Sequence, residues 1–175
     1  FTQAQLTTAV LETIRANGFS HCYIRPLIYR GYDSLGVFAD ACPIEVAILV
    51  WEWGTYFSQE ALEEGLDVKI STWARLAPNT LPAMAKCVAN YANSQLIAME
   101  ARIDGYAEGL ALDTEGNVSE GSGQNLFLVR DGLIYTPPFG SSVLAGITRD
   151  SVITIAEDLG FEVREQVLPR EILYL

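Results

Sequence analysis

Apolar residues recur every three or four positions near the start of the chain, which is the spacing of one face of an α-helix. This face is formed by Leu6, Val10 and Ile14. We predict the helix over residues 3–17, with a capping box formed by Thr2 and Gln5 at its start. Gly18 is suited to end it, because glycine readily adopts the left-handed backbone that closes many helices. The chain is therefore predicted to open with an amphipathic helix.

Two segments rich in aromatic and β-branched side chains follow, at residues 21–31 and 43–53. This composition favours β-strands, and the stretch between them is rich in turn-forming residues. The strand pattern then stops, and a short helix is predicted at residues 59–64, with Gly65 at its end. This break indicates a domain boundary, which we place in the segment 53–65.

The rest of the chain mixes short strands and helices without a regular βαβ alternation. Strands are predicted at residues 66–73, 108–113, 125–130, 133–136 and 161–168. Helices are predicted at residues 90–104 and 148–159, and a further helix is expected to begin after Pro169. Glu115-Gly116-Asn117 and Asp131-Gly132 are hairpin-turn signals between short strands. The pattern therefore predicts an α+β fold.

The charge of the chain argues against two classes of partner. Its 175 residues carry a formal net charge of -11, and the sequence pI is near 4.4. Nucleic acids and anionic membrane surfaces bind clustered Lys and Arg instead. No apolar run reaches the length of a membrane span, and no basic segment followed by an apolar core opens the sequence. We therefore expect no nucleic-acid or membrane partner and no signal peptide.

The cysteines and the single histidine, His21, argue against metal chemistry. Cys22, Cys42 and Cys87 are an odd number without C-x-x-C spacing, which favours reduced thiols over a disulfide framework or a zinc site. His21 alone does not make a metal site, and no G-x-S-x-G motif supports a Ser-His-Asp hydrolase centred on it. We therefore expect no metal and a cytoplasmic location.

Lys86 is the first candidate for chemistry. It lies in the apolar run Leu81-Pro82-Ala83-Met84-Ala85-Lys86-Cys87-Val88-Ala89, and no acidic residue occurs between Asp67 and Glu100. If this segment is buried, the loss of hydration disfavours the ammonium form and lowers the pKa of the lysine, as a Schiff-base nucleophile requires. The alternative is a lysine that extends its charged end into solvent.

Two further segments supply groups that complement such a lysine. Residues 118–127 place Glu120 in a glycine-rich turn at the mouth of a strand, either facing a ligand or as an ordinary turn residue. Residues 144–150 place Gly146 before a helix start, where free N–H groups and the Thr148 hydroxyl bind phosphate or simply cap the helix. Together, an amine, a carboxylate and an anion site are what pyridoxal 5'-phosphate requires.

Several short segments also occur in an order that is typical of one enzyme family. They are Tyr23-Ile24-Arg25-Pro26-Leu27-Ile28, Ala77-Pro78-Asn79-Thr80, Ala85-Lys86 with Asn90-Tyr91, Ser119-Glu120-Gly121 with Gly123 and Asn125-Leu126-Phe127, Thr136-Pro137-Pro138, and Gly146-Ile147-Thr148-Arg149-Asp150. Through them nearly the whole chain resembles the branched-chain amino acid aminotransferases, pyridoxal phosphate enzymes of fold type IV. The resemblance implies two domains: residues 1–52 complete a smaller α/β domain, 53–65 connect, and 66–175 form an incomplete larger domain that binds the cofactor.

The resemblance also implies a role for each matching residue at the cofactor. Lys86 would bind pyridoxal 5'-phosphate covalently and then move a proton between substrate and cofactor. Glu120 would pair with the pyridinium nitrogen, and Tyr91 would donate a hydrogen bond to the phenolate oxygen. The phosphate end would be lined, mostly through backbone groups, by Gly123, Leu144, Ile147 and Thr148.

For the substrate, the resemblance points to Tyr23, Arg25 and Tyr56. Tyr23 and Arg25 would face substrate carboxylates, and the guanidinium fork of Arg25 suits the side-chain carboxylate of glutamate. Tyr56, in the connecting segment, would cover the pocket. The alternatives are a tyrosine packed under a surface arginine, since Tyr23 and Arg25 share one face of a strand, and a simple loop aromatic at Tyr56.

The implied reaction is transamination between amino acids and 2-oxo acids. Leucine, isoleucine or valine would leave as a branched 2-oxo acid, and 2-oxoglutarate would take the amino group to become glutamate. The family works as homodimers, so a dimer or an assembly of dimers is implied. D-amino acid and (R)-amine aminotransferases and aminodeoxychorismate lyases share the lysine and the glutamate and stay open as alternatives. A non-catalytic binding module that kept the fold is an alternative from another class.

The family pattern extends beyond the chain at both ends. Family chains begin upstream of Phe1 and continue past Leu175, so this chain is expected to be a central portion without the N- and C-terminal parts. The upstream part supplies an arginine for the cofactor phosphate and a tyrosine for the neighbouring subunit. The downstream part supplies a Ser-Gly-Thr-type turn for the substrate's α-carboxylate. Gln124 stands where many members have Glu, which alters the hydrogen bonding expected around Glu120.

Overall fold

Thr2 begins helix α1 (Gln3–Asn17) in the computed structural model, which describes residues 1–54 and 58–175. The predicted capping box is confirmed: the Thr2 N–H donates to Gln5 Oε1 at 2.8 Å, and the Gln5 N–H donates to Thr2 Oγ1 at 3.3 Å. Gly18 ends the helix with a φ of 71°, in the left-handed region that glycine adopts without steric cost.

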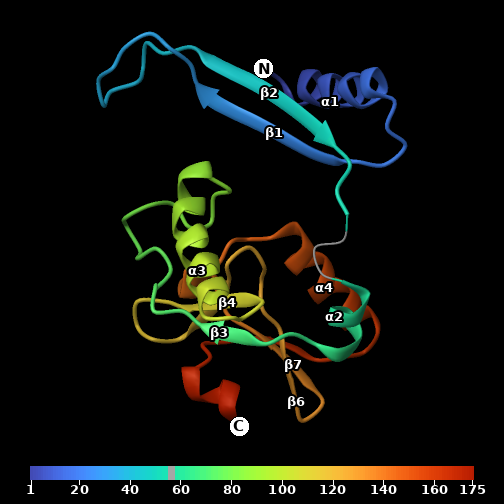
Figure 1. Ribbon diagram of the computed structural model, residues 1–175, viewed down its shortest axis with the longest axis vertical. Coiled ribbons are helices and arrows are strands. Elements are labelled where there is room, and N and C mark those ends of the chain that lie inside the picture. Colours follow the sequence, from blue (N-terminus) through green and yellow to red (C-terminus); the bar gives the residue numbers. More distant parts are fainter. Residues whose placement is uncertain (55–57) are drawn as a thin grey trace. The chain divides into compact units, whose positions relative to one another are not determined.

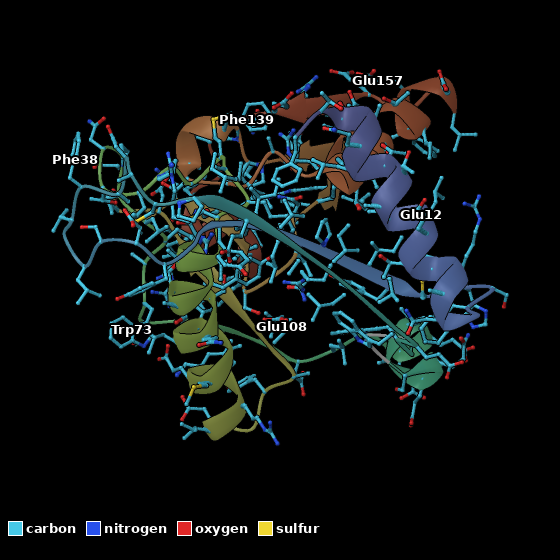
Figure 2. All side chains as sticks on the ribbon, turned by 90° about the horizontal axis from the view of Figure 1, so that it is seen from above. Glu12, Phe38, Trp73, Glu108, Phe139 and Glu157 are labelled. Atoms are coloured by element: carbon cyan, nitrogen blue, oxygen red, sulfur yellow. The ribbon has the colours of Figure 1, made fainter. Side chains whose placement is uncertain are left out.

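The chain forms two units, Phe1–Ser58 and Gln59–Leu175. In the first, α1 is followed by two antiparallel strands, β1 (Tyr23–Arg30) and β2 (Ile44–Trp51). Both lie within the predicted strand segments. The loop that joins them carries Phe38, at the end of this unit opposite Glu12 of α1 (Figure 2).

The second unit contains the remaining elements (Figure 1). Its α-helices are α2 (Gln59–Glu64), α3 (Tyr91–Ile103) and α4 (Ile147–Asp158). Its strands are β3 (Val68–Ile70), β4 (Glu108–Leu112), β5 (Val118–Gly121), β6 (Leu128–Arg130), β7 (Leu133–Thr136) and β8 (Val163–Glu165). Three short 3-10 helices are η1 (Val88–Asn90), η2 (Phe139–Ser141) and η3 (Arg170–Tyr174). The predicted final helix is thus a 3-10 helix.

The strands of the second unit form two mixed sheets, in the orders β3-β4-β5 and β6-β7-β8. In each, two strands are antiparallel and the third is parallel to its neighbour. The predicted turns join the antiparallel pairs: Gly116 has a φ of 86°, and Asp131 and Gly132 both have positive φ, the backbone of a tight hairpin. The α+β prediction is therefore confirmed.

The core of the second unit lies on β4 and β5. Leu110, Val118 and Leu168 form its buried cluster, and Val118 and Leu168 are fully buried. Helix α3 lies directly against β4 at Gly109, where an added Cβ would come within 2.7 Å of the Ile97 carbonyl oxygen. Only glycine allows this approach, because real Cβ contacts are essentially never so short. None of the helices in the described part of the chain is long and apolar enough to cross a bilayer.

An ion cluster joins β3 to the end of α3. The Lys69 ammonium donates to Glu100 Oε1 at 2.9 Å and also contacts Asp104. The other carboxylate oxygen of Glu100 accepts from the Ser71 hydroxyl and from the Thr72 N–H. The Ser71 hydroxyl and the Lys69 ammonium lower the pKa of Glu100 from 4.5 to about 2.

This lowered pKa predicts acid-sensitive stability. A carboxyl whose pKa is lower in the folded state stabilises the fold above its ordinary pKa, and that contribution is lost as the pH falls toward the folded-state value. The free energy of unfolding should therefore fall between about pH 5 and pH 2 more steeply in the original protein than in Glu100→Gln, as measured by urea denaturation at several pH values. Equal pH dependence of the two free energies of unfolding would show that the ionisation of Glu100 does not contribute to the acid sensitivity.

Candidate active site

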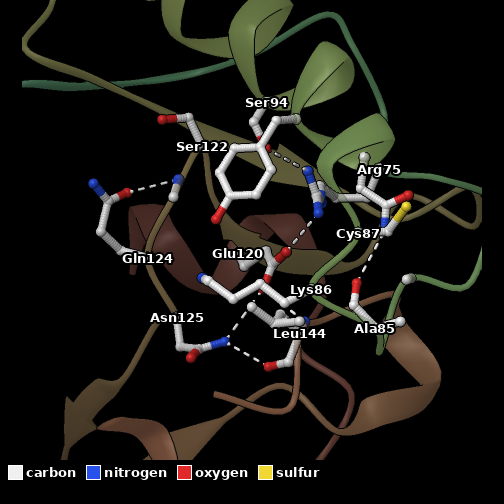
Figure 3. A pocket seen from close by; sticks show the side chains of 14 residues that line it. Arg75, Ala85, Lys86, Cys87, Ser94, Glu120, Ser122, Gln124, Asn125 and Leu144 are labelled. Atoms are coloured by element: carbon white, nitrogen blue, oxygen red, sulfur yellow. Dashed lines mark hydrogen bonds and ion pairs between the residues drawn. The ribbon is translucent and has the colours of Figure 1, made fainter. Parts of the chain in front are cut away.

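A pocket in the second unit collects several of the residues singled out in the sequence. Its walls come from the segment between β3 and α3, the start of α3, the end of β5 with the turn after it, and the segment before α4 (Figure 3). The lining residues are Arg75, Ala83, Ala85, Lys86, Cys87, Asn90, Tyr91, Ser94, Glu120, Ser122, Gly123, Gln124, Asn125 and Leu144. An amine, a phenol and a buried carboxylate therefore share one cavity.

Glu120 lies in a strand, so its predicted place in a glycine-rich turn is wrong. It belongs to β5, which pairs antiparallel with β4, and it is only 5% exposed. The turn begins after it, where the Gly121 N–H donates to the Gln124 carbonyl at 2.8 Å. Val-Ser-Glu-Gly has little intrinsic strand preference, and pairing with β4 determines its conformation.

Both carboxylate oxygens of Glu120 are held by hydrogen-bond donors. Oε1 accepts from the Arg75 guanidinium at 2.7 Å. Oε2 accepts from the Leu144 N–H at 2.9 Å and from the Asn125 amide at 3.2 Å. Burial raises the pKa of Glu120, and the Leu144 N–H, Arg75 and, more weakly, the Lys86 ammonium oppose the rise. The acid is thus fixed in position while its charge depends on its neighbours.

Lys86 is exposed, so the burial predicted for it is wrong. The apolar run around it forms turns at the rim of the pocket, because Asn90 bonds to the backbone of this segment. The Asn90 amide donates to the carbonyls of Pro82 at 3.0 Å and Ala85 at 3.1 Å. Lys86 Nζ lies 5.6 Å from the centre of the Tyr91 ring, within the range of a cation–π contact. In Figure 3 its side chain extends toward Glu120 and Asn125.

Arg75 is a site residue that the sequence reasoning missed. It is 6% exposed, and besides Glu120 it donates to Asn93 Oδ1 at 2.9 Å and to Ser94 Oγ at 3.3 Å, both on α3. A signal for it was present. Arg75 lies in the same acid-free stretch, between Asp67 and Glu100, that drew attention to Lys86. A cation without acidic sequence neighbours can pair with an acid only through the fold, as Arg75 does with Glu120.

Asn125 ties Glu120 to the segment before α4. Its amide donates to the Leu144 carbonyl at 3.0 Å as well as to Glu120. Its Oδ1 sits where a side chain at Gly146 would have to go. The close approach of Gly146 and Asn125 therefore keeps the carboxylate and the start of α4 together.

Gly146→Ala tests this contact. Gly146 has a φ of −74°, which alanine accepts, so any cost must come from the overlap with Asn125. We expect a loss of about 1–3 kcal/mol in the free energy of unfolding, typical of overpacking, measured by urea denaturation of the intact protein. Gly140→Ala is the matched control, because nothing lies within 4 Å of a Cβ there. Equal effects of the two substitutions would contradict the proposed contact.

The other predicted cofactor residues divide into two groups. Gly123 and Leu144 line the pocket with Lys86, Tyr91 and Glu120. Ile147 and Thr148 form the first turn of α4 and are exposed, and they are not among the described residues that line the pocket. Gln124 does not take the place of an acid beside Glu120: its amide donates to Glu108 Oε2 at 2.9 Å, and its oxygen accepts from the Gly123 N–H.

The predicted substrate residues lie in the first unit or outside the described residues. Tyr23 and Arg25 are neighbours on one face of β1, and Arg25 Nη2 donates to the Tyr23 hydroxyl at 3.0 Å. The Tyr23 ring packs against Trp51, with ring centres 4.8 Å apart, and against Trp53 at 4.9 Å. The second substrate tyrosine, Tyr56, lies outside the described residues.

Comparison with known proteins identifies the family to which the chain belongs. A family model described as amino-transferase class IV matches residues 1–174. The branched-chain-amino-acid aminotransferase of Escherichia coli (strain K12) is 52% identical over 172 residues, which are 98% of this chain and 56% of that protein.

Solved structures of branched-chain aminotransferases also match the fold of this chain. The crystal structure of the Escherichia coli enzyme superposes with a TM-score of 0.96 at 50% identity, covering 100% of this chain and 58% of that one. The holo form of the branched-chain amino acid aminotransferase from Thermobaculum terrenum superposes with a TM-score of 0.89 at 38% identity, covering 100% and 57%. The chain thus spans somewhat more than half the length of the relatives that it matches. It belongs to the class IV aminotransferase family.

Proposed function

We propose that this chain carries the lysine and the acid of a pyridoxal 5'-phosphate-dependent aminotransferase, which transfers amino groups between branched-chain L-amino acids and 2-oxoglutarate. One observation carries the proposal: Lys86 and Tyr91 line the same pocket as Glu120, which is distant from both in sequence. The names of the relatives support the substrate class, since those compared are branched-chain aminotransferases.

The chemistry of the pocket fits the cofactor. Lys86 offers an exposed amine for covalent attachment, and Glu120 offers a buried carboxylate to the pyridinium nitrogen. Ile147 and Thr148 at the start of α4 would hold the phosphate end through free N–H groups. Gly123 and Leu144 line the pocket, and their own N–H groups already donate to Gln124 and Glu120. The solved Thermobaculum terrenum relative is the form that contains pyridoxal phosphate. When bound, the cofactor supplies an electron-accepting ring.

Lys86, Glu120 and Tyr91 would have different roles in the reaction. Lys86, at the rim, would take the proton from the Cα of the amino acid and return one, as a general acid and base. Glu120 would favour the protonated ring nitrogen, because a buried anion stabilises a cation next to it. Tyr91 would donate from its hydroxyl to the phenolate oxygen of the cofactor, and its ring contacts the Lys86 ammonium. Proton transfer and charge stabilisation thus fall to different side chains.

We further propose the larger organisation that the resemblance implies. Residues 1–52 would complete the smaller domain, 53–65 connect, and 66–175 form most of the cofactor-binding domain; the boundary between the two observed units falls inside the connecting segment. Tyr23, Arg25 and Tyr56 would contact the substrate. The protein would act as a homodimer or an assembly of dimers in the cytoplasm; an odd number of cysteines without C-x-x-C spacing supports the reducing location.

A panel of amino donors tests the function directly. The intact protein, loaded with pyridoxal 5'-phosphate, is assayed with 2-oxoglutarate and with L-leucine, L-isoleucine, L-valine, D-alanine or an (R)-amine. We expect glutamate to form with the three branched L-amino acids and not with the others. Preference for a D-amino acid or an (R)-amine would assign the protein to another branch of the family, and failure to bind the cofactor would identify a non-catalytic module.

Arg25→Met should separate the two halves of the reaction. One pocket must accept both an aliphatic chain and the γ-carboxylate of glutamate, and only the carboxylate needs a cation. We expect kcat/KM to fall by about 10²-fold or more for glutamate and 2-oxoglutarate, equivalent to about 2.7 kcal/mol, and much less for leucine. Single-turnover absorbance measures each half-reaction separately. Arg30→Met, on the same strand, is the control. Equal losses for both substrates would mean that Arg25 supports Tyr23 instead.

A further inference from the structure

We propose that Arg75 is the positioning residue that keeps the Glu120 carboxylate ionised and correctly oriented inside the pocket. The inference deepens the proposed function, because the catalytic use of that charge rests on it. It starts from the burial of both partners: the side chains of Arg75 and Glu120 are 5% and 7% exposed, and Nη2 lies 2.7 Å from Oε1.

The environment of Glu120 offers few other sources of positive charge. The groups that face it are the Arg75 guanidinium, the Lys86 ammonium, the Asn125 amide and the Leu144 N–H. The amide and the N–H are neutral donors. Lys86 is exposed, and in the proposed function its amine is consumed in covalent attachment to the cofactor, so its charge is not a constant support. Arg75 remains positively charged, since a guanidinium keeps its proton at every pH that proteins tolerate.

Arg75 is itself fixed from three directions. Its backbone N–H donates to the Leu112 carbonyl on β4 at 2.8 Å. Its guanidinium donates to Asn93 and Ser94 in the first turns of α3. The Asn93 amide returns a hydrogen bond to the Ala74 carbonyl at 2.9 Å. A charge so restrained loses little freedom when it orients a partner, and a rigid donor is what holds a carboxylate at one angle.

A lysine in place of Arg75 would not reproduce this arrangement. The guanidinium donates to Glu120 through Nη2 and to two side chains of α3 through Nη1. The two terminal nitrogens of one planar group therefore bind different partners. An ammonium is a point donor on a flexible stem and cannot fix both at once. Arg75→Lys should therefore preserve the charge of Glu120 but not its orientation, which separates the two parts of the proposal.

The test measures the titration of Glu120 in the intact protein without cofactor. Difference infrared spectroscopy follows the carbonyl stretch of the protonated carboxyl, and the band is assigned by its loss in Glu120→Gln. We expect Arg75→Met to raise the titration midpoint by about 1–3 pH units, the size of the effect of an adjacent cation on a carboxyl. Arg75→Lys should shift it little, yet weaken pyridoxal 5'-phosphate binding at least about threefold because Glu120 is no longer held at one angle.

Arg149→Met is the matched control. Arg149 is also a buried arginine in an ion pair, with Glu165 at 2.6 Å, but it does not line the pocket. It should lower the melting temperature without moving the midpoint of Glu120. An unchanged midpoint in Arg75→Met would overturn the proposal, and so would equal shifts in both variants.

A second measurement covers the case in which Arg75→Met is too unstable to be titrated: a double variant that also removes the Glu120 charge should regain stability. If the buried ion pair stabilises both residues, the double variant Arg75→Met/Glu120→Gln should be more stable than the sum of the single effects predicts, because no charge is left buried without its partner. Additive losses would contradict the pairing. Neither the titration midpoint nor the stability of the double variant needs bound cofactor or turnover, so a failed donor panel would overturn the proposed function alone, and an unchanged midpoint would overturn the role of Arg75 alone.

Discussion

Lys86→Ala is expected to abolish covalent attachment of pyridoxal 5'-phosphate and to reduce turnover to background. Loss of the general acid and base alone costs about 10²- to 10⁴-fold in rate, and loss of the covalent anchor adds to it. The remaining lysine of the chain does not replace it: Lys69 is engaged by Glu100 on α3 and by Asp104 just after that helix. Borohydride reduction of the loaded protein, followed by mass mapping of the labelled peptide, should mark residue 86 in the original protein and no residue in the variant.

Lys69→Ala provides the comparison. It removes the other lysine and breaks the ion cluster, so it should lower stability and leave the labelling of Lys86 intact. If instead Lys86→Ala kept the absorbance of a covalently bound cofactor and a normal rate, the assignment of this pocket would be wrong.

Glu120→Gln is expected to lower kcat by at least about 100-fold while the protein still binds the cofactor. The substitution keeps the size of the side chain but removes its negative charge, so the ring nitrogen loses the anion that favours its protonated form. Each tenfold loss in rate corresponds to about 1.4 kcal/mol of transition-state stabilisation, so the expected loss is about 2.7 kcal/mol or more. Stopped-flow absorbance with leucine measures the chemical step by itself.

Glu108→Gln controls for the loss of a glutamate near the same sheet. Glu108 lies on β4, the strand paired with β5; its carboxylate accepts from the Gln124 amide, and it is not among the described residues that line the pocket. It should change stability without changing kcat. A normal kcat in Glu120→Gln would reduce Glu120 to a structural residue of β5.

The sequence identified several residues that line the pocket but did not predict their physical setting. Lys86 was identified by its apolar neighbours, which predicted burial, yet it is exposed. Apolar residues in irregular segments do not have to face inward; here Asn90 holds the segment at the rim through its backbone. The same acid-free stretch contained Arg75, whose ion pair with Glu120 joins residues far apart in sequence and is visible only in three dimensions.

Elements with strong local signals were predicted well, and those that depend on tertiary pairing were not. The capped helix α1 and the hairpin at Asp131-Gly132 follow from local preferences, and both form as predicted. Strand β5 is short and has little intrinsic preference, and it exists because β4 pairs with it. Glu120 lies on that strand, so its burial could not be predicted from the sequence of the turn beside it.

Gly109 sets the spacing between a helix and a sheet, and this has a consequence for protein engineering. Because α3 lies against β4 at the one position that lacks a side chain, any replacement there must move the helix away from the strand. The same helix begins with Tyr91 and carries the partners of Arg75 in its first turns. A combinatorial library that varies β4 to raise thermal tolerance should therefore leave residue 109 unchanged, since even a methyl group there would displace pocket residues that the mutation never touches.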